Sequence, residues 1–243
     1  MPQKKVLAFS SSREGDSNFL ESAAPLIKDF LGEKHLNVGF IPFADVNNDY
    51  DAYANKVSEA LINFPYTIQS LTPANAQSLV ETVDIIMVGG GNTFKLLHDI
   101  YSLNIFELIK TKVSAGTPYI GWSAGSNLTS PGIYTSNDMP IIEPASFKAF
   151  GFFPFQLNPH YYNFSPPGFN GETRDQRLEE FLLLNQHTKV LGLPEGTALL
   201  LDKGMLSLKG SSTATLFNYN KTTGVVRKEI NPGEDLTNLL QAV

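Results

Sequence analysis

The segment Gly121-Trp122-Ser123-Ala124-Gly125 has the G-x-S-x-G spacing of a serine nucleophile. The apolar run Tyr119–Trp122 predicts a strand that leads into Ser123, and a helix is expected after it. A tight turn between strand and helix exposes the serine hydroxyl, and small flanking residues relieve crowding there. The pattern therefore favours nucleophilic chemistry at Ser123 over its alternative, a glycine-rich turn in which the serine caps a helix.

A second glycine-rich segment, Gly89–Gly91, lies between a predicted strand at Asp84–Val88 and a predicted helix at Thr93–Ile100. Glycines allow the backbone to approach a ligand closely and to point N–H groups at an anion. The segment could supply half of an oxyanion hole or cradle a phosphate, or it could be a tight turn at a sheet edge. It lacks both the Lys-Ser/Thr of a P-loop and the G-x-G-x-x-G spacing, so nucleotide binding is weakly supported.

A serine nucleophile needs a base, and the chain has four histidines. His160 is the best candidate, because it lies in a charge-poor stretch and follows Pro159, which restricts the backbone before it. The other three have less suitable surroundings: His35 and His187 lie in polar, turn-like segments, and His98 lies beside Leu96 and Leu97 on a predicted helix.

Two acids are candidates for orienting the imidazole of His160. Asp138 lies in a polar loop, and Glu195 follows a predicted strand at Val190–Leu193, where a carboxylate could face the same cleft as Ser123. Each also has a plain alternative, an Asx-type turn for Asp138 and an exposed loop position for Glu195. The sequence leaves the choice between them open.

Arg174 and Arg177 lie at the start of a helix predicted over Thr173–Leu184. Arginine presents a planar fork that suits a carboxylate, so one of them could hold an acidic substrate side chain. For Arg177, a surface pair with Asp175 or Glu180 is at least as good an explanation. No grouping of His, Asp and Glu has convincing metal-ligand spacing, and we expect neither a metal nor a cofactor.

Short apolar runs alternate with amphipathic stretches over the first two-thirds of the chain, which predicts a parallel sheet with helices on both faces. The tail differs, because its strands are joined by short turns, and an antiparallel edge is expected there. The expected elements are strands at Val6–Ser10, Leu36–Phe43, Tyr66–Ser70, Ala198–Asp202, Met205–Leu208, Thr213–Tyr219 and Val225–Ile230, and helices at Asn18–Leu31, Ala52–Leu61, Ala74–Thr82, Ile105–Val113 and Asp235–Gln241. The charge-poor stretch from Gly121 to Asn170 is too long for a simple connection, which predicts loops that carry function.

Composition narrows the class of protein. The 243 residues are 42% hydrophobic and 17% charged, and we expect them to form a single α/β domain over residues 1–243. A net charge of -6 argues against nucleic acid or an anionic membrane as a partner. The chain has no cysteine, which excludes thiol catalysis and disulfides. No signal peptide or membrane span is visible, so a cytoplasmic protein is expected.

Several segments, taken in chain order, together resemble the serine peptidase family that comprises the peptidase E aspartyl dipeptidases and the cyanophycinases. The matching segments are Phe40–Ala44, Val88–Phe94, Gly121–Gly125, Thr135–Pro140, Asn158–His160, Gly171–Arg174 and Leu193–Gly196. The resemblance implies a three-layer sandwich related to class I glutamine amidotransferases, with a mostly parallel central sheet. It also implies cleavage of dipeptides that begin with aspartate, without a cofactor.

The resemblance also implies residue roles. Ser123 would be the nucleophile and His160 the base, with Asp138 or Glu195 as the third member. Gly90 or Gly91 with Ala124 would form the oxyanion site, Arg174 would bind the aspartyl carboxylate, and Asn92 is a further candidate for substrate binding. The partner would be a small acidic dipeptide, and the protein a monomer or homodimer. The alternatives are a cyanophycinase-like peptidase or an esterase on the same scaffold, or a non-catalytic module that binds a phosphate or nucleotide at Gly89–Gly91.

Overall fold

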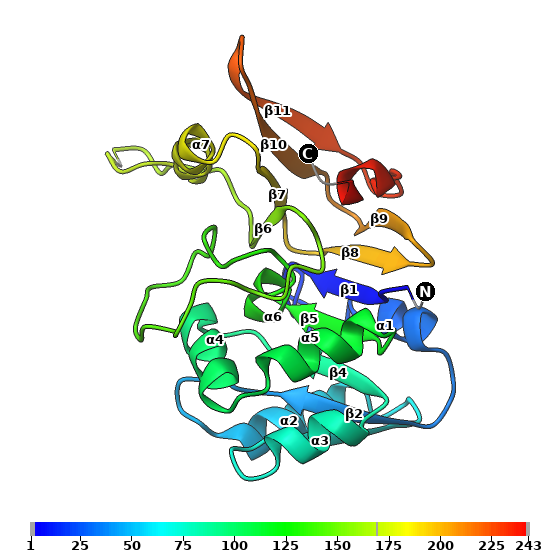
Figure 1. Cartoon of the computed structure of the whole chain (residues 1–243). Helices are drawn as coiled ribbons and strands as arrows, with labels where there is room; N and C mark the ends of the chain where they lie inside the picture. The colour runs from blue at the N-terminus through cyan, green and yellow to red at the C-terminus, as the bar shows by residue number, and fades with distance from the viewer. Residues whose placement is uncertain (1–2, 169, 242–243) are drawn as a thin grey trace.

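The computed structural model describes residues 3–168 and 170–241, which form two β-sheets (Figure 1). Met1, Pro2, Phe169, Ala242 and Val243, which the single-domain prediction includes, lie outside the described residues. The larger sheet has the strand order β3 (Tyr66–Ser70), β2 (Leu36–Ile41), β4 (Ile85–Val88), β5 (Tyr119–Trp122), β1 (Val6–Phe9), β8 (Thr197–Asp202) and β9 (Met205–Gly210). The first five strands in this order are parallel, whereas β8 and β9 are antiparallel to their neighbours.

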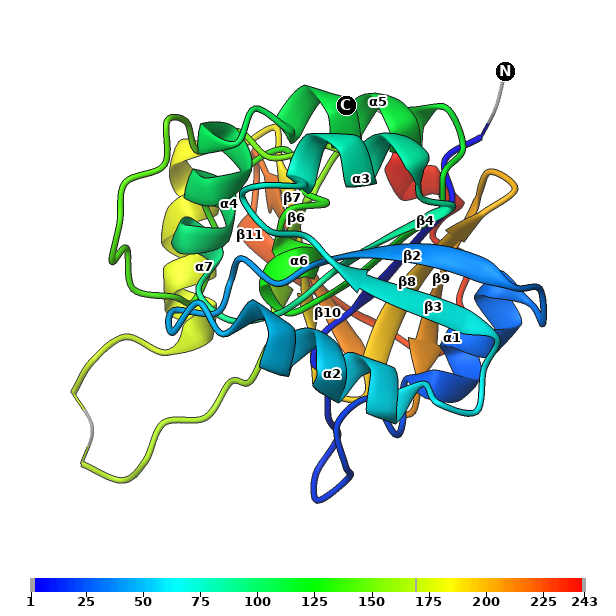
Figure 2. The ribbon, with the colours of Figure 1, turned by 90° about the horizontal axis from the view of Figure 1, so that it is seen from below.

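Helices cover both faces of the larger sheet (Figure 2). On one face lie α1 (Ala24–Leu31) and α2 (Tyr50–Ala60), and on the other lie α3 (Ala76–Thr82), α4 (Thr93–Ser102) and α5 (Phe106–Ser114). Ile27 and Val57 pack on the first face against Trp122, whereas Val80 and Ile109 pack on the second. Strands buried on both sides are apolar throughout, as in β4 and β5. The predicted α/β layers with a mostly parallel central sheet are confirmed.

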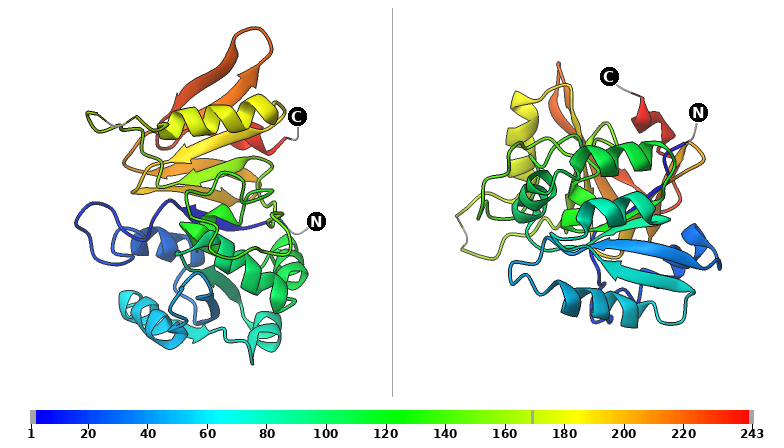
Figure 3. Two further views of the ribbon diagram at one scale, coloured as in Figure 1. Left: turned by 90° about the vertical axis from the view of Figure 1, so that its left-hand side faces the viewer. Right: turned by 60° about the horizontal axis from the view of Figure 1, so that its bottom comes forward.

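A smaller sheet of four strands lies beside the larger one. Its order is β11 (Gly224–Ile230), β10 (Ala214–Asn220), β7 (Lys189–Leu193) and β6 (Gln156–Pro159), of which only β6 and β7 are parallel. Helix α7 (Arg174–Leu184) crosses one face, where Leu178 and Leu182 pack on Val190 and Phe217 (Figure 3). The other face contributes Leu191 to the core that also holds strands of the larger sheet.

The structure corrects three details of the expected elements. The helix expected from Asn18 begins only at Ala24, because Leu20 has a positive φ of 56° and Pro25 marks the first turn of the helix. The tail does not form one antiparallel edge but divides between the two sheets. The segment expected as a helix at Asp235–Gln241 contains only a short 3-10 helix at Thr237–Leu240.

No helix in residues 3–168 or 170–241 has the length and hydropathy needed to cross a bilayer.

Candidate active site

Ser123 lies at a sharp bend between β5 and the short helix α6 (Ala124–Asn127). Its backbone angles are φ 54° and ψ -114°, a conformation that side-chain-bearing residues rarely adopt. The bend needs glycine at Gly125, because a Cβ atom there would collide with the carbonyl group of Val88. The G-x-S-x-G segment therefore adopts the strained strand-to-helix turn that its spacing predicts.

Three backbone N–H groups near Ser123 have no acceptor within the described part of the chain: those of Gly90, Gly91 and Ala124. Gly90 approaches the serine so closely that a Cβ atom added there would lie 2.9 Å from the Ser123 Cβ. Gly91 has φ 137°, which favours glycine. Gly90 and Gly91 line the same cavity as Ser123, and Ala124 follows it directly, so these groups offer unpaired donors near the serine, which is what an oxyanion requires.

His160 links Ser123 to Glu195 through its two ring nitrogens. His160 follows β6, and its Nε2 lies 2.9 Å from the Ser123 Oγ. Its Nδ1 lies 2.7 Å from Oε1 of Glu195, which comes two residues after the end of β7. The hydroxyl, the imidazole and the carboxylate thus form one continuous chain of polar contacts, with the histidine in the middle. Such an order allows the carboxylate to hold the proton on Nδ1 and leave Nε2 free to accept the serine proton.

Ser10, which the sequence analysis did not single out, fixes the backbone of His160. It is fully buried just after β1. Its hydroxyl donates to the Leu193 carbonyl at 2.7 Å and accepts from the His160 N–H at 2.9 Å. Ser10 therefore ties the end of a strand in the larger sheet to the ends of β6 and β7 in the smaller one.

Asp138 lies at the start of helix α4 instead of beside the imidazole. Its Oδ2 accepts from the backbone N–H of Thr93 at 2.8 Å and from the Thr93 hydroxyl at 2.5 Å. A carboxylate at this position satisfies a free donor of the helix and complements the helix dipole. Of the two acids that the sequence left open, Glu195 is the one that contacts His160.

Asn92 caps the same helix. Its side-chain oxygen accepts from the Lys95 N–H at 3.0 Å, and its Nδ2 donates to the Met139 carbonyl at 2.8 Å. Both ends of the side-chain amide are therefore engaged within the protein. One amide hydrogen is left over for a ligand, since an NH₂ group has two donors.

Arg174 is the first residue of α7, which Thr173 and Gln176 begin with reciprocal capping hydrogen bonds. Its guanidinium donates to the side-chain oxygen of Asn137, whose Nδ2 donates to the Pro159 carbonyl at 2.8 Å. Burial, and then the neighbouring charge of Arg177, lower the pKa of Arg174. Arg174 is half-buried, and only Asn137 separates its guanidinium from the backbone just before His160, so it is well placed to meet an anion. Arg177 is exposed.

A cavity of about 250 Å³ opens beside Ser123 and His160. Its wall includes Arg13, Tyr53 and Lys56. Burial raises the pKa of Tyr53 to about 12, so its hydroxyl keeps its proton and donates to the Gly90 carbonyl at 3.1 Å. None of these three residues lies in a motif, so no pattern in the sequence marks them.

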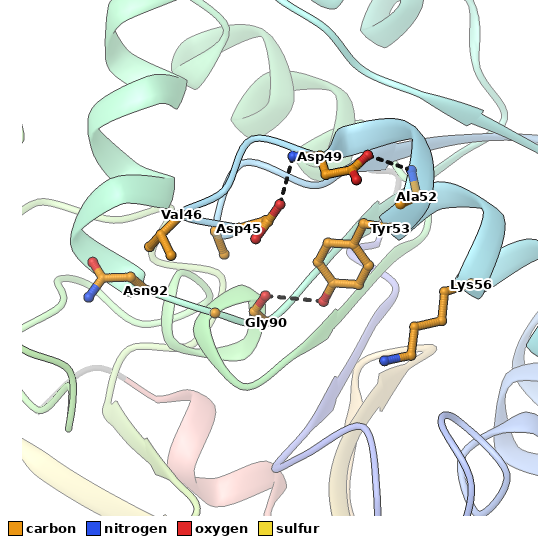
Figure 4. A pocket seen from close by; sticks show the side chains of 10 residues that line it. Asp45, Val46, Asp49, Ala52, Tyr53, Lys56, Gly90 and Asn92 are labelled. Atoms are coloured by element: carbon orange, nitrogen blue, oxygen red, sulfur yellow. Dashed lines mark hydrogen bonds between the residues drawn. The ribbon is translucent and has the colours of Figure 1, made fainter.

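A second cavity, of about 430 Å³, adjoins the first, because Tyr53, Lys56, Gly90 and Gly91 line both. Figure 4 shows Tyr53 and Lys56 on one helix and Gly90 facing them from the loop that follows β4. The remaining wall is formed by Ala44, Asp45, Val46, Asp49, Ala52 and Asn92.

The other three histidines lie apart from this site. The Nδ1 atoms of His98 and His35 contact the carbonyl groups of Glu143 and Pro65, at 2.9 Å and 3.1 Å. His187 is exposed.

The model of peptidase family S51 matches residues 6–209, which include every residue of the site described above. The chain belongs to peptidase family S51. It is 43% identical to a peptidase E of Nostoc sp. (strain PCC 7120), over 98% of this chain and 97% of that relative. It is 45% identical to a peptidase E of Shewanella amazonensis, over 97% of this chain and 99% of the relative. As an S51 member the chain is a peptidase, a hydrolase of peptide bonds.

The fold of this S51 chain also matches a solved structure, that of a peptidase from an acI-B1 Actinobacterium. The TM-score is 0.65, the sequence identity is 16%, and the match covers 96% of each chain. The fold is that of the class I glutamine amidotransferase-like sandwiches, as the resemblance implied.

Proposed function

We propose that this protein is a serine-type dipeptidase that hydrolyses dipeptides with an N-terminal aspartate through an acyl-enzyme. The observation that carries the proposal is the contact chain from the Ser123 Oγ through His160 to Glu195, with distances of 2.9 Å and 2.7 Å. Family membership supports peptide hydrolysis, and the relatives' name, peptidase E, agrees with it.

In the proposed mechanism, Ser123 attacks the peptide carbonyl carbon while its proton passes to Nε2 of His160. The N–H groups of Gly90 or Gly91 and of Ala124 stabilise the negative charge on the carbonyl oxygen. His160 then gives the proton to the leaving nitrogen, and the C–N bond breaks to leave an ester on Ser123. A water molecule, deprotonated by His160, hydrolyses that ester and restores the serine.

In this mechanism Glu195 accepts a hydrogen bond from Nδ1 of His160 and stabilises the imidazolium as it forms. Arg174 binds the side-chain carboxylate of the substrate aspartate, which is consistent with its contact to Asn137, the residue that donates to the carbonyl before His160. The partner is thus a small acidic dipeptide, and its charge provides the selectivity.

Hydrolysis by the Ser123→Ala variant tests the proposed nucleophile. Because the change removes only one oxygen, we expect a folded protein whose turnover of Asp-Leu falls by at least about 1,000-fold. Circular dichroism serves as the control for folding, and labelling of the unchanged protein by a fluorophosphonate serves as the positive control. Full activity in the alanine variant would contradict the proposed role of Ser123 as nucleophile.

The substrate class is tested by a panel of Asp-Leu, Glu-Leu, Asn-Leu, Leu-Leu, an aspartyl-arginine conjugate and a simple ester. Asp-Leu should be the best substrate, because neither a longer side chain nor a neutral one places a charge at Arg174 in the same way. Preference for the conjugate or the ester would instead indicate a cyanophycinase-like peptidase or an esterase.

A further inference from the structure

The cavity beside Ser123 and His160 has a one-sided charge. Two cationic side chains, Arg13 and Lys56, line it, and its described lining residues include no aspartate or glutamate. Both are exposed, and neither forms an ion pair with any residue in the described ranges. Two unpaired cations facing a reaction centre indicate that an anionic part of the substrate lies there.

The two cations have defined positions relative to Ser123. Lys56 lies one helical turn after Tyr53, whose hydroxyl donates to the Gly90 carbonyl. Its Nζ lies 4.5 Å from the centre of the Phe19 ring, which contacts the Trp122 ring edge to face at 6.1 Å. Arg13 follows Ser10, which holds the His160 backbone. Lys56 is thus connected to Trp122, the residue before Ser123, through packed rings, whereas Arg13 lies in the loop that begins at Ser10.

A dipeptide that begins with aspartate carries two carboxylates, one on its first side chain and one at its C-terminus. Arg174, which we propose for the first, is bonded to Asn137 outside this cavity. The second carboxylate belongs to the leaving residue, and it lies a few bonds beyond the scissile nitrogen. Arg13 and Lys56 are the cations that line the space next to that bond.

We propose that Lys56, assisted by Arg13, binds the C-terminal carboxylate of the leaving residue and thereby selects free dipeptides over blocked or extended peptides. This inference rests on the proposed function, which it deepens by naming a subsite. An ammonium group is a compact charge suited to a carboxylate on a small, movable leaving group. Because Lys56 also lines the second cavity, a side chain of the leaving residue has room there (Figure 4).

The test compares Asp-Leu with Asp-Leu amide, which lacks the terminal charge. We expect wild-type kcat/KM to favour the free dipeptide roughly tenfold, a modest factor because the cations are exposed and solvent screens them. Lys56→Met should lose about that factor on Asp-Leu and little on the amide, and Arg13→Gln should show the same pattern more weakly. Lys56→Arg should retain the preference, and Lys221→Met, the same charge change at a distant exposed turn, should match wild type.

Equal losses on both substrates in Lys56→Met, or no wild-type preference for the free carboxylate, would overturn the subsite. The preference should also weaken as salt is raised. The same ratio measured on Leu-Leu and Leu-Leu amide separates the two proposals. Efficient cleavage of Leu-Leu with an intact carboxylate preference would overturn only the aspartate specificity, whereas a protein that cleaves neither Asp-Leu nor Leu-Leu would overturn both proposals.

Discussion

At the scale of single residues, the proposed nucleophile has a strained backbone, and the proposed base is held by a buried hydroxyl. Ser123 and His160 both have positive φ values, 54° and 52°, although neither is glycine. Backbones of this kind cost free energy and persist only where the surroundings hold them. Gly125, which packs closely against the Val88 carbonyl, supports the bend at Ser123, and the Ser10 hydroxyl accepts from the N–H of His160.

Substitution of the two acids should separate their roles. Glu195→Gln keeps the shape of the side chain but removes the charge that faces Nδ1, so kcat should fall about 10- to 100-fold with little change in stability. Asp138→Asn should retain most of kcat and instead destabilise the protein by about 1 kcal/mol, through its contacts with Thr93. Kinetics on Asp-Leu measure the effect on kcat, and urea unfolding measures the effect on stability. If Asp138→Asn had the lower kcat of the two variants, Asp138 and not Glu195 would be the acid that supports His160.

Ser10→Ala should impair the positioning of His160, whose backbone N–H donates to the Ser10 hydroxyl. Loss of the hydroxyl leaves the partly buried N–H of His160 without its acceptor, so we expect a stability loss of about 1–3 kcal/mol and a fall in kcat of about tenfold. The matched control is Thr129→Val, which removes a buried hydroxyl that donates to the Ser126 carbonyl. A similar stability loss without the fall in kcat is expected for the control. Equal kinetics in the two variants would contradict a positioning role for Ser10.

At the scale of elements, the site is an assembly of strand ends. Ser123, Gly89, Ser10, His160 and Glu195 each follow the carboxyl end of a strand, at β5, β4, β1, β6 and β7 in turn. Parallel strands bring these ends to one edge, which is where open α/β sheets bind ligands. Helix α7 adds Arg174 from its first turn.

The cap of α7 therefore bears on substrate binding. Thr173→Ala removes the side-chain acceptor for the Gln176 N–H and should cost about 1 kcal/mol. Because fraying of the first turn releases Arg174, KM for Asp-Leu should rise several-fold while kcat changes little. Steady-state kinetics test this expectation, and a fall in kcat at constant KM would count against it.

The sequence was informative wherever a segment's own residues decide its structure. Tyr66–Ser70 and Tyr119–Trp122 are strands with the predicted bounds, because apolar and β-branched runs favour them locally. Strand β6 was missed, since Gln156-Leu157-Asn158-Pro159 is short and half polar and becomes a strand only by pairing with β7.

The sequence could not decide between Asp138 and Glu195 for the same reason, namely that the answer depends on the pairing of distant strands. Both acids lie in loops distant in sequence from His160, and only the pairing of β6 with β7 brings Glu195 to the imidazole. Lys56 and Arg13 carry no local signal at all, because exposed cations on a helix and a loop are common in any protein. The proposed active serine could be predicted, but the carboxylate subsite could not.

At the scale of the whole molecule, the two sheets share one core. Leu157 and Leu191 of the smaller sheet belong to the same buried cluster as Val6 and Ile41 of the larger one. A continuous core of this kind favours cooperative unfolding, whereas the small cluster under α7 is separate. The single-domain prediction is thereby open to a direct test.

Trp122, the only tryptophan, reports on the larger sheet, whereas the proposed mechanism requires His160, which follows a strand of the smaller sheet. We expect the urea midpoints of tryptophan fluorescence, far-ultraviolet circular dichroism and activity on Asp-Leu to coincide. Loss of activity at a clearly lower urea concentration than loss of the fluorescence signal would indicate two independently folding units.

The placement of Ser123 and its proposed base in different sheets bears on biosynthesis. A ribosome releases Ser123 long before it completes β7 and Glu195, and β8 can join β1 only after that. Domains generally form as units once enough chain has emerged. In the proposed mechanism, a nascent fragment that ends before the second sheet thus carries a serine hydroxyl without its base, so we expect the growing polypeptide to be inert toward peptides in its surroundings until His160 and Glu195 have been added.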